Sequence, residues 1–344
     1  MIEIFSLTNL SIPVIQAPMA GGITTPVLVS EVSNAGGLGS FGFAYSSPEI
    51  IGRDLRLAQS LTQGPINANF FLFQETALPD SKTIQLAIES LREIAPDIDF
   101  VIPASPFYPD LEMQLEPIWQ LRPSVLSFHF GIPSDLIMQR ARALDIAIGI
   151  TATSLEEALQ IERAGANFII AQGIEAGGHR GIFTNELTDA RLTTFELLPQ
   201  VVRRCTVPVV AAGGIMDGRD IRKAIDFGAS AVQMGTAFLC CAESGASSEY
   251  KAALMAERPR PSVFTKGFSG RWARGVENAF TRHMEGKSTL PFPMQNTLTG
   301  ALRQVAARSH DPEHQSLWAG VAFHKARALK VCELMNALQI ELKG

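Results

Sequence analysis

The sequence predicts an α/β protein, a (β/α)₈ TIM barrel followed by a helical C-terminal subdomain or lid. Eight short apolar runs each end at Gly, Ser, Thr or another polar residue, as buried parallel strands do where they leave a core. Helical patterns lie between most of these runs, and eightfold strand–helix alternation favours a closed barrel over an open doubly wound sheet. The expected strands span residues 14–19, 38–42, 66–71, 125–130, 147–150, 168–172, 207–212 and 231–235.

Capping signals indicate where two of the helices between the later strands begin and end. Residues 154–164 start at a capping Ser154 and end before Gly165, and residues 217–227 repeat this scheme with Gly228 at the end. The connection 73–123 is long, so we expect a helix at 80–94 and a proline-rich excursion. The expected organisation is a barrel at 1–241, a helical subdomain or lid at 242–316, and a C-terminal helix at 317–344 that packs back on the barrel.

Composition and net charge argue against several classes of function. Of the 344 residues, 46% are hydrophobic and 18% charged, and the net charge of −5 provides no basic field for nucleic acid or anionic lipid. The uncharged stretch 4–30 contains three prolines and a Gly-Gly pair, so neither a signal peptide nor a membrane span is expected. Four scattered cysteines without a C-x-x-C motif indicate a reduced, cytoplasmic protein. No histidine pair has metal-ligand spacing, so no metal is expected.

Glycine turns follow the seventh and eighth strands, at Gly213-Gly214 and at Gly235. Glycine lets backbone N–H groups approach an anion closely, and the loops after these two strands form the usual phosphate site of this barrel. The alternative is that these glycines only turn the chain tightly.

Two histidines are expected at the mouth of the barrel. His179 lies on the glycine-rich loop after the sixth strand, where it is a candidate general base or a surface histidine bonded to the loop backbone. His129 ends the fourth strand, where it binds substrate or satisfies a buried neighbour.

Amide side chains also recur at strand ends. Asn69, Gln172 and Gln233 each need a partner there, and one polar, planar ligand is a simpler explanation than three structural accidents. Met19, at the end of the first strand, is either an adaptable ligand contact or core.

At these residues the chain resembles the nitronate monooxygenase family. The resembling motifs are Q-A-P-M-A-G-G at 16–22, N-A-G-G-L-G at 34–39, S-F-H-F-G at 127–131, Q-G-I-E-A-G-G-H-R-G at 172–181, A-A-G-G-I at 211–215, Q-M-G-T-A-F at 233–238, F-S-G-R-x-A-R-G at 268–275 and Q-N-x-L-T at 295–299. The E-A-G-G-H run is also similar to bacterial flavin-dependent enoyl-acyl-carrier-protein reductases and related quinone reductases. The resemblance implies that His179 is catalytic and that FMN contacts Met19, Asn69, Gln172, Gly177, Gly214, Gln233, Met234, Gly235 and Thr236.

The resemblance implies oxidation of an alkyl nitronate, such as propionate 3-nitronate, by O₂ and FMN to a carbonyl compound and nitrite. His179 would stabilise the nitronate when protonated, or remove the α-proton of a nitroalkane when neutral. The alternatives are an NAD(P)H-dependent reductase acting on a quinone or an enoyl thioester, a flavin-free lyase or isomerase that binds a sugar phosphate, and a non-catalytic flavin protein. The expected partners are a small-molecule substrate and O₂, with a homodimer left open.

Overall fold

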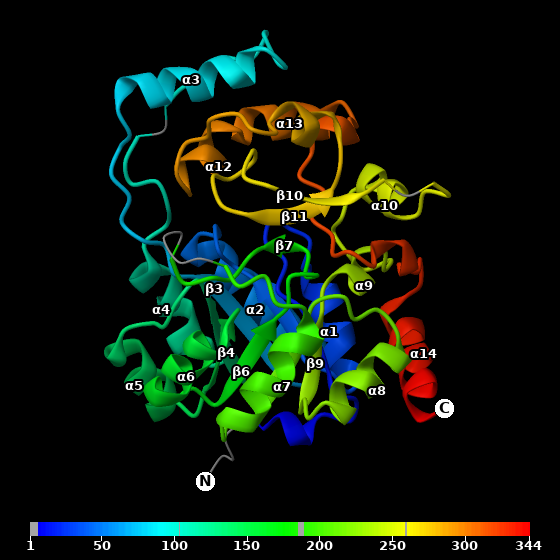
Figure 1. Ribbon diagram of the computed structural model, residues 1–344. Coiled ribbons are helices and arrows are strands. Elements are labelled where there is room, and N and C mark those ends of the chain that lie inside the picture. The colour runs from blue at the N-terminus through cyan, green and yellow to red at the C-terminus, as the bar shows by residue number, and fades with distance from the viewer. Residues whose placement is uncertain (1–5, 103, 185–188, 259) are drawn as a thin grey trace.

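The computed structural model describes residues 6–102, 104–184, 189–258 and 260–344, so residues 1–5 of the expected barrel segment lie outside the described part. Eight parallel strands form one sheet in the order β1-β9-β8-β6-β5-β4-β3-β2. The first and last members of this order meet where Ile15 bridges Leu38 in parallel, so the sheet closes into a barrel and the predicted fold class is confirmed (Figure 1). The strands are β1 (Val14–Gln16), β2 (Gly39–Gly42), β3 (Ile66–Phe71), β4 (Val125–His129), β5 (Ala147–Ala152), β6 (Phe168–Gln172), β8 (Val209–Ala212) and β9 (Ala231–Met234).

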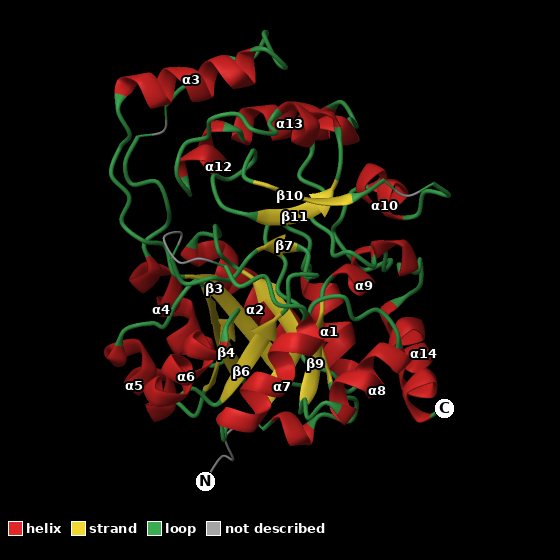
Figure 2. Cartoon of the chain, viewed as in Figure 1, coloured by secondary structure: helices red, strands yellow, loops and turns green. Residues whose placement is uncertain are grey.

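Helices surround the barrel on its outside (Figure 2). The predicted caps are present: the Ser154 hydroxyl accepts from the backbone N–H of Glu157, and Gly165 ends that helix with a φ of +80°. The helices of this layer are α1 (Pro26–Asn34), α2 (Pro48–Leu61), α4 (Leu111–Leu121), α5 (Asp135–Ala143), α6 (Leu155–Ala164), α7 (Thr194–Arg204), α8 (Gly218–Asp226) and α14 (Val331–Lys343).

The barrel strands bury both of their faces. Along β6, Phe168 and Ile170 belong to one apolar cluster and Ile169 and Ala171 to another, as the two-residue period of a strand requires. The Phe168 ring passes so close to Gly149 that a Cβ at that position would lie 2.2 Å from a ring carbon. A glycine on β5 therefore allows this ring to fill the lumen at the end of the barrel opposite the mouth.

A second apolar core lies above the mouth of the barrel, and the long connection after β3 contributes to it. Helix α3 (Ser81–Arg92) places Ile84, Ala87 and Leu91 in one cluster with residues of the 268–302 region, such as Phe268 and Leu298. Figure 1 shows α3 beside α12 (Met294–Leu298) and α13 (Gly300–Arg308), away from the barrel helices. The segment expected as barrel, 1–241, thus includes an excursion that packs with the lid.

Region 242–316, which was expected to form a helical subdomain or lid, contains helices and also a β-hairpin that was not predicted. Strands β10 (Ser262–Thr265) and β11 (Ala273–Val276) pair antiparallel, and β11 also pairs with the two-residue strand β7 (Gly178–His179). These strands lack an apolar run because each is only two to four residues long. The remaining elements of this region are α10 (Ser248–Leu254), α11 (Ala279–His283) and η2 (Pro312–His314).

The C-terminal segment is helical over a shorter range than 317–344. Only α14 forms a long helix, and it packs against α8 and α1, with Glu341 accepting from the Gly218 N–H at 2.8 Å. Residues 317–330 are irregular apart from the short η3 (Phe323–Lys325), and Trp318 bridges Gly275 of the lid hairpin. None of the described helices is long and apolar enough to span a bilayer.

Candidate active site

A cavity of about 450 Å³ lies between the C-terminal ends of the barrel strands and the lid. This is the end of the barrel at which active sites of this fold are built. The cavity wall includes all twelve site residues predicted from the sequence, whose individual roles stay predictions: Met19, Asn69, His129, Gln172, Gly177, His179, Gly213, Gly214, Gln233, Met234, Gly235 and Thr236.

The two glycine turns lie side by side because β8 and β9 are neighbours, with Ala212 paired to Gln233. Gly213 and Gly214 have φ values of +116° and +73°, which favour glycine. Gly235 precedes the four-residue helix α9 (Thr236–Leu239). A Cβ added at Gly235 would lie 3.8 Å from the Met19 sulfur. The turns therefore present backbone to the cavity at two adjacent strand ends.

The three amides differ in how they are used. Gln172 donates to the His179 carbonyl at 3.1 Å and accepts from the Gly181 N–H at 2.8 Å, so its amide holds the loop. The Asn69 amide donates to the Ser127 hydroxyl at 2.9 Å. The buried Oε1 of Gln233 has no partner among the described residues. Gln233 alone of the three thus keeps a buried acceptor that a ligand would have to satisfy.

The lid hairpin sets the position of His179. Ala273 of β11 pairs with His179, and the His179 Nε2 lies 2.9 Å from the Ser269 hydroxyl oxygen. That hydroxyl donates its one proton to the Arg271 carbonyl at 3.1 Å, so its oxygen accepts from Nε2–H. Because a neutral imidazole carries one N–H, Nδ1 keeps its lone pair, and it has no partner among the described residues.

Both histidines of the cavity are uncharged near neutral pH. Desolvation is the main cause that lowers the pKa of His179 to about 3, with further contributions from the neighbouring His129 and from the positive charges of Arg271 and Arg303. Desolvation likewise lowers the pKa of His129 to about 3, while its hydrogen bond to the His179 carbonyl opposes that shift. The 3.2 Å contact of His129 Nε2 with that carbonyl makes His129 a support for the loop. The arrangement therefore offers a neutral base at residue 179.

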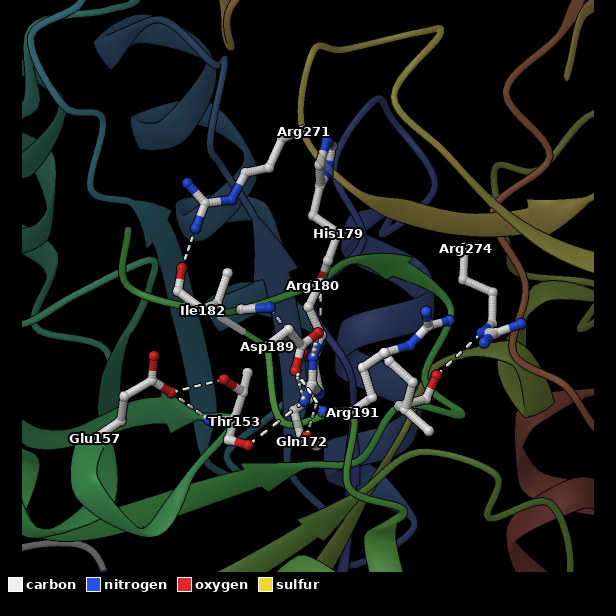
Figure 3. A network of polar contacts seen from close by, with 12 residues as sticks. Thr153, Glu157, Gln172, His179, Arg180, Ile182, Asp189, Arg191, Arg271 and Arg274 are labelled. Carbon is white, nitrogen blue, oxygen red and sulfur yellow. Dashed lines mark hydrogen bonds and ion pairs between the residues drawn. The ribbon is translucent and has the colours of Figure 1, made fainter. Parts of the chain in front are cut away.

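Arg180 connects the same loop to the barrel. Figure 3 shows the side chains of His179 and Arg180 pointing in opposite directions from adjacent positions. The buried guanidinium bonds both oxygens of Asp189 at 2.9 Å and donates to the carbonyls of Gln172 and Thr153. Arg180 thus ties the loop after β6 to the ends of β5 and β6.

We expect Arg180→Met to lower the free energy of unfolding by about 2–3 kcal/mol, because it removes a buried charge and leaves carbonyls and a carboxylate without their donor. Urea unfolding followed by circular dichroism measures this loss. The control is Arg191→Met, since Arg191 is exposed and lies over the Phe264 ring. An equal effect of the two substitutions would contradict the assigned role of Arg180.

Sequence reasoning missed several residues of the wall. Ser269 stands in a motif that was noted for its resemblance, yet only the fold shows its contact with His179. Tyr45, Asn296, Arg303 and Trp318 come from the loop after β2, from the lid and from the C-terminal segment. Asn296 stands in the Q-N-x-L-T motif noted for its resemblance, and no signal in the sequence places the other three at the cavity. In the described part of the chain, His, Cys, Asp and Glu side chains form no group of three that could hold a metal.

The fold and the site define a (β/α)₈-barrel enzyme with its active site at the C-terminal ends of the strands. The nitronate monooxygenase family model matches residues 5–341. Curated nitronate monooxygenases from Pseudomonas aeruginosa and Paraburkholderia phytofirmans are 39% and 38% identical, over 98% of this chain and 98% and 94% of theirs. The chain belongs to the nitronate monooxygenase family, as the motifs predicted, and it is an oxidoreductase.

Two solved structures share this fold. A nitroalkane oxidase from Streptomyces ansochromogenes has a TM-score of 0.92 and 34% identity, over 98% of this chain and 97% of that one. FabK from Thermotoga maritima has a TM-score of 0.75 and 27% identity, over 98% and 94%. The nitronate monooxygenase family is flavin-dependent in general.

Proposed function

We propose that this protein uses non-covalently bound FMN and O₂ to oxidise alkyl nitronates to a carbonyl compound and nitrite. The observation that carries the proposal is the neutral imidazole of His179, whose Nδ1 has no partner among the described residues and which lies in one cavity wall with the glycine turns after β8 and β9. Family membership supports nitronate oxidation in general, and the choice of FMN and O₂ belongs to the proposal.

The residues present fit a flavin. In the part of the chain that the structure describes, the buried Oε1 of Gln233 has no partner, and a polar ring bound in the cavity would supply one. Gly213, Gly214 and Gly235 would hold the phosphate through backbone N–H groups, and Met19 would pack on the ring system. Bound flavin would supply the electron transfer between the nitronate and O₂.

The chain itself would position the substrate and move its proton. His179 would take the α-proton of a neutral nitroalkane at Nδ1, with its ring held by Ser269. His129 and Gln172 would keep the imidazole in place through their hydrogen bonds to the His179 carbonyl. Phe130, Phe292 and Trp318 lie with ring centroids 5.5–5.9 Å from His179 and would exclude water. A substrate supplied as the nitronate has already lost its α-proton, so this proton transfer would not occur.

Anaerobic titration of the purified protein tests the proposal. We expect a yellow protein whose flavin absorbance bleaches on addition of propionate 3-nitronate and returns with nitrite release when O₂ is admitted. Bleaching by NADH and not by the nitronate would instead favour a reductase, the function class of the E-A-G-G-H resemblance. A purified protein that takes up no FMN would contradict the proposal.

We expect kcat/KM for a neutral nitroalkane to stay level from pH 8 down to about pH 5. The base is the neutral imidazole, and its pKa of about 3 means that protonation begins only below that window. Initial rates of nitrite formation across this range, with the flavin content checked at each pH, measure the profile. A fall centred near pH 6.5, the usual histidine pKa, would show an imidazole that is not held neutral by its surroundings.

A further inference from the structure

The turn between β10 and β11 reaches His179 from the lid. Phe268 is buried in the lid core, and the next residue, Ser269, contacts the imidazole. Gly270 follows with a φ of +85°, and a Cβ there would overlap a backbone carbonyl, so the chain turns where only glycine fits. This tight turn leads the chain from the lid core, past the imidazole, to Arg271.

The side chain of Arg271 crosses from this turn to the barrel. Its guanidinium donates to the carbonyl of Ile182, on the loop that follows His179 (Figure 3). The guanidinium carbon also lies 3.8 Å from the centre of the Phe130 ring, directly after β4. Phe130 has a φ of +78°, a conformation that aromatic residues rarely adopt, so its surroundings must hold it there. Arg271 thus joins the lid to two separate loops of the barrel mouth.

The charge of Arg271 is buried but retained. Only 3% of the residue is exposed, and desolvation lowers the pKa of the guanidinium to about 10, while the charge of Glu157 opposes that shift. The buried Glu157 carboxylate accepts from the backbone N–H of Phe183, the residue after Ile182, at 2.8 Å. The carboxylate that compensates the charge therefore also fixes the loop that Arg271 contacts. Arg271 stays a cation at neutral pH.

The backbone of Arg271 fixes the proton of His179. The Ser269 hydroxyl accepts from the Arg271 N–H at 3.3 Å and donates to the Arg271 carbonyl at 3.1 Å. Its second lone pair accepts from Nε2–H of His179 at 2.9 Å. A hydroxyl has one proton and two lone pairs, so its hydrogen-bonding capacity is fully used. A displacement of Arg271 would release Ser269, and with it the tautomer that leaves Nδ1 as the base.

We propose that Arg271 is a positioning residue for the base, because its contacts with Ile182 and Phe130 hold Ser269 against Nε2 of His179. This inference rests on the proposed nitronate oxidation, in which Nδ1 takes the α-proton of a neutral nitroalkane. Arg271 is not among the described residues that line the cavity, so it acts through Ser269 and not on the substrate.

The charge of Arg271 supports the same role. The ionisable groups that act on the His179 imidazole are His129 of β4, Arg271 of the hairpin turn and Arg303 of α13, and all three disfavour a second proton. The other described contacts of the ring are the Ser269 hydroxyl and uncharged aromatic rings. Removal of the Arg271 charge should therefore raise the pKa of His179.

Kinetics of Arg271→Met with two substrates test this role. We expect kcat for 1-nitropropane to fall about 10- to 100-fold, since small displacements of a catalytic group cost up to about 10²-fold, while KM stays within about 3-fold. Oxidation of propyl-1-nitronate, which has already lost its α-proton, should change less than about 3-fold. The acid limit of kcat/KM for 1-nitropropane should move to higher pH than in the parent protein, because one charge that repels the imidazolium is gone.

Two control variants separate charge, geometry and stability. Arg271→Lys keeps the charge but loses the planar guanidinium, so the acid limit should stay at that of the parent protein while kcat falls about 3- to 10-fold. Arg274→Met removes another buried arginine of the hairpin, which donates to the carbonyls of Ile174 and Ser262. Arg274 is not among the charges that act on His179. Its loss should lower stability without moving the acid limit or separating the two substrates.

Nuclear magnetic resonance tests the positioning without turnover. With ¹⁵N in the six histidine rings of the protein as purified, and His179→Asn to assign the signal, His179 should show the Nε2–H tautomer at pH 7. Arg271→Met should show a mixture of tautomers and titration at higher pH, even if the protein oxidised no nitronate.

Three results would each overturn the role of Arg271. They are an unchanged tautomer and titration in Arg271→Met, equal kcat losses for both substrates, and the same shifts in Arg274→Met. If Arg271→Met does not fold, Arg271→Lys decides, since full kcat for 1-nitropropane in that variant would show that the guanidinium contacts do not position the base.

Discussion

Replacing His179 with asparagine is expected to lower nitrite release from a neutral nitroalkane by about 10³-fold, within the range of general-base catalysis. Asparagine can still accept and donate a hydrogen bond but has no titratable nitrogen, so the base at Nδ1 is lost. A preformed nitronate needs no proton removal, and its oxidation should fall by less than about 10-fold. Steady-state rates with 1-nitropropane and with propyl-1-nitronate measure the two effects in one variant.

The contrast between the two substrates decides between the two roles considered for this histidine. An imidazolium that stabilises the nitronate would make the preformed nitronate the more sensitive substrate, but a pKa of about 3 leaves little imidazolium at neutral pH. His324→Asn is a matched control because His324 is exposed and does not line the cavity. If His179→Asn lost flavin and both activities together, residue 179 would be a structural residue.

The barrel was predictable because its signals are local. Each strand is a short apolar run buried on both faces, and helix caps such as Ser154 and Asp217 act within three residues of their own position. Closure is not local, since it depends on the contact between Ile15 and Leu38. The eightfold strand–helix alternation predicted closure of the barrel only because few other folds contain eight strand–helix units.

A helical lid at 242–316 was expected, but its hairpin and its packing with α3 were not, because the contacts that build them are not local. Its hairpin pairs residues 262–265 with 273–276, and Ala273 and Arg274 pair with the two-residue strand at 178–179. Its core joins α3 to residues about 200 positions away. Neither contact leaves a periodic pattern in the sequence. The glycine turns and strand-end amides on the barrel side of the cavity could be predicted from the sequence. The positions of Arg303 and Ser269 could not.

Gln172 shows a further limit of reading amides from sequence. A buried amide needs partners, but the sequence cannot say whether a ligand or the protein supplies them. At Gln172 both the oxygen and the nitrogen bond the loop at 179–181, whereas at Gln233 the oxygen is left without a described partner. The same sequence argument, that a strand-end amide needs a partner, thus covered two glutamines whose amides have different surroundings in the fold.

Gly214→Asp is expected to weaken flavin binding by about 100-fold or more. A Cβ at this position would lie 3.3 Å from the Cβ of Glu175, so the new carboxylate would stand beside that side chain at the edge of the glycine turn, and the φ of +73° would add strain. Two like charges about 5 Å apart repel by about 3 kcal/mol at an effective dielectric constant of about 20, and a phosphate dianion increases this. Flavin released on dialysis, measured by fluorescence, gives the affinity.

Two further variants divide that loss into its causes. Gly214→Asn has nearly the same shape and tolerates the positive φ, so it should keep most of the flavin if charge is the main factor. Combining Gly214→Asp with Glu175→Gln removes the repulsion between the two carboxylates and leaves only that between residue 214 and the bound phosphate. Flavin binding that stayed weak in this double variant would support phosphate at the turn. Full recovery would mean that the aspartate acts on Glu175 and that the anion is held elsewhere in the cavity.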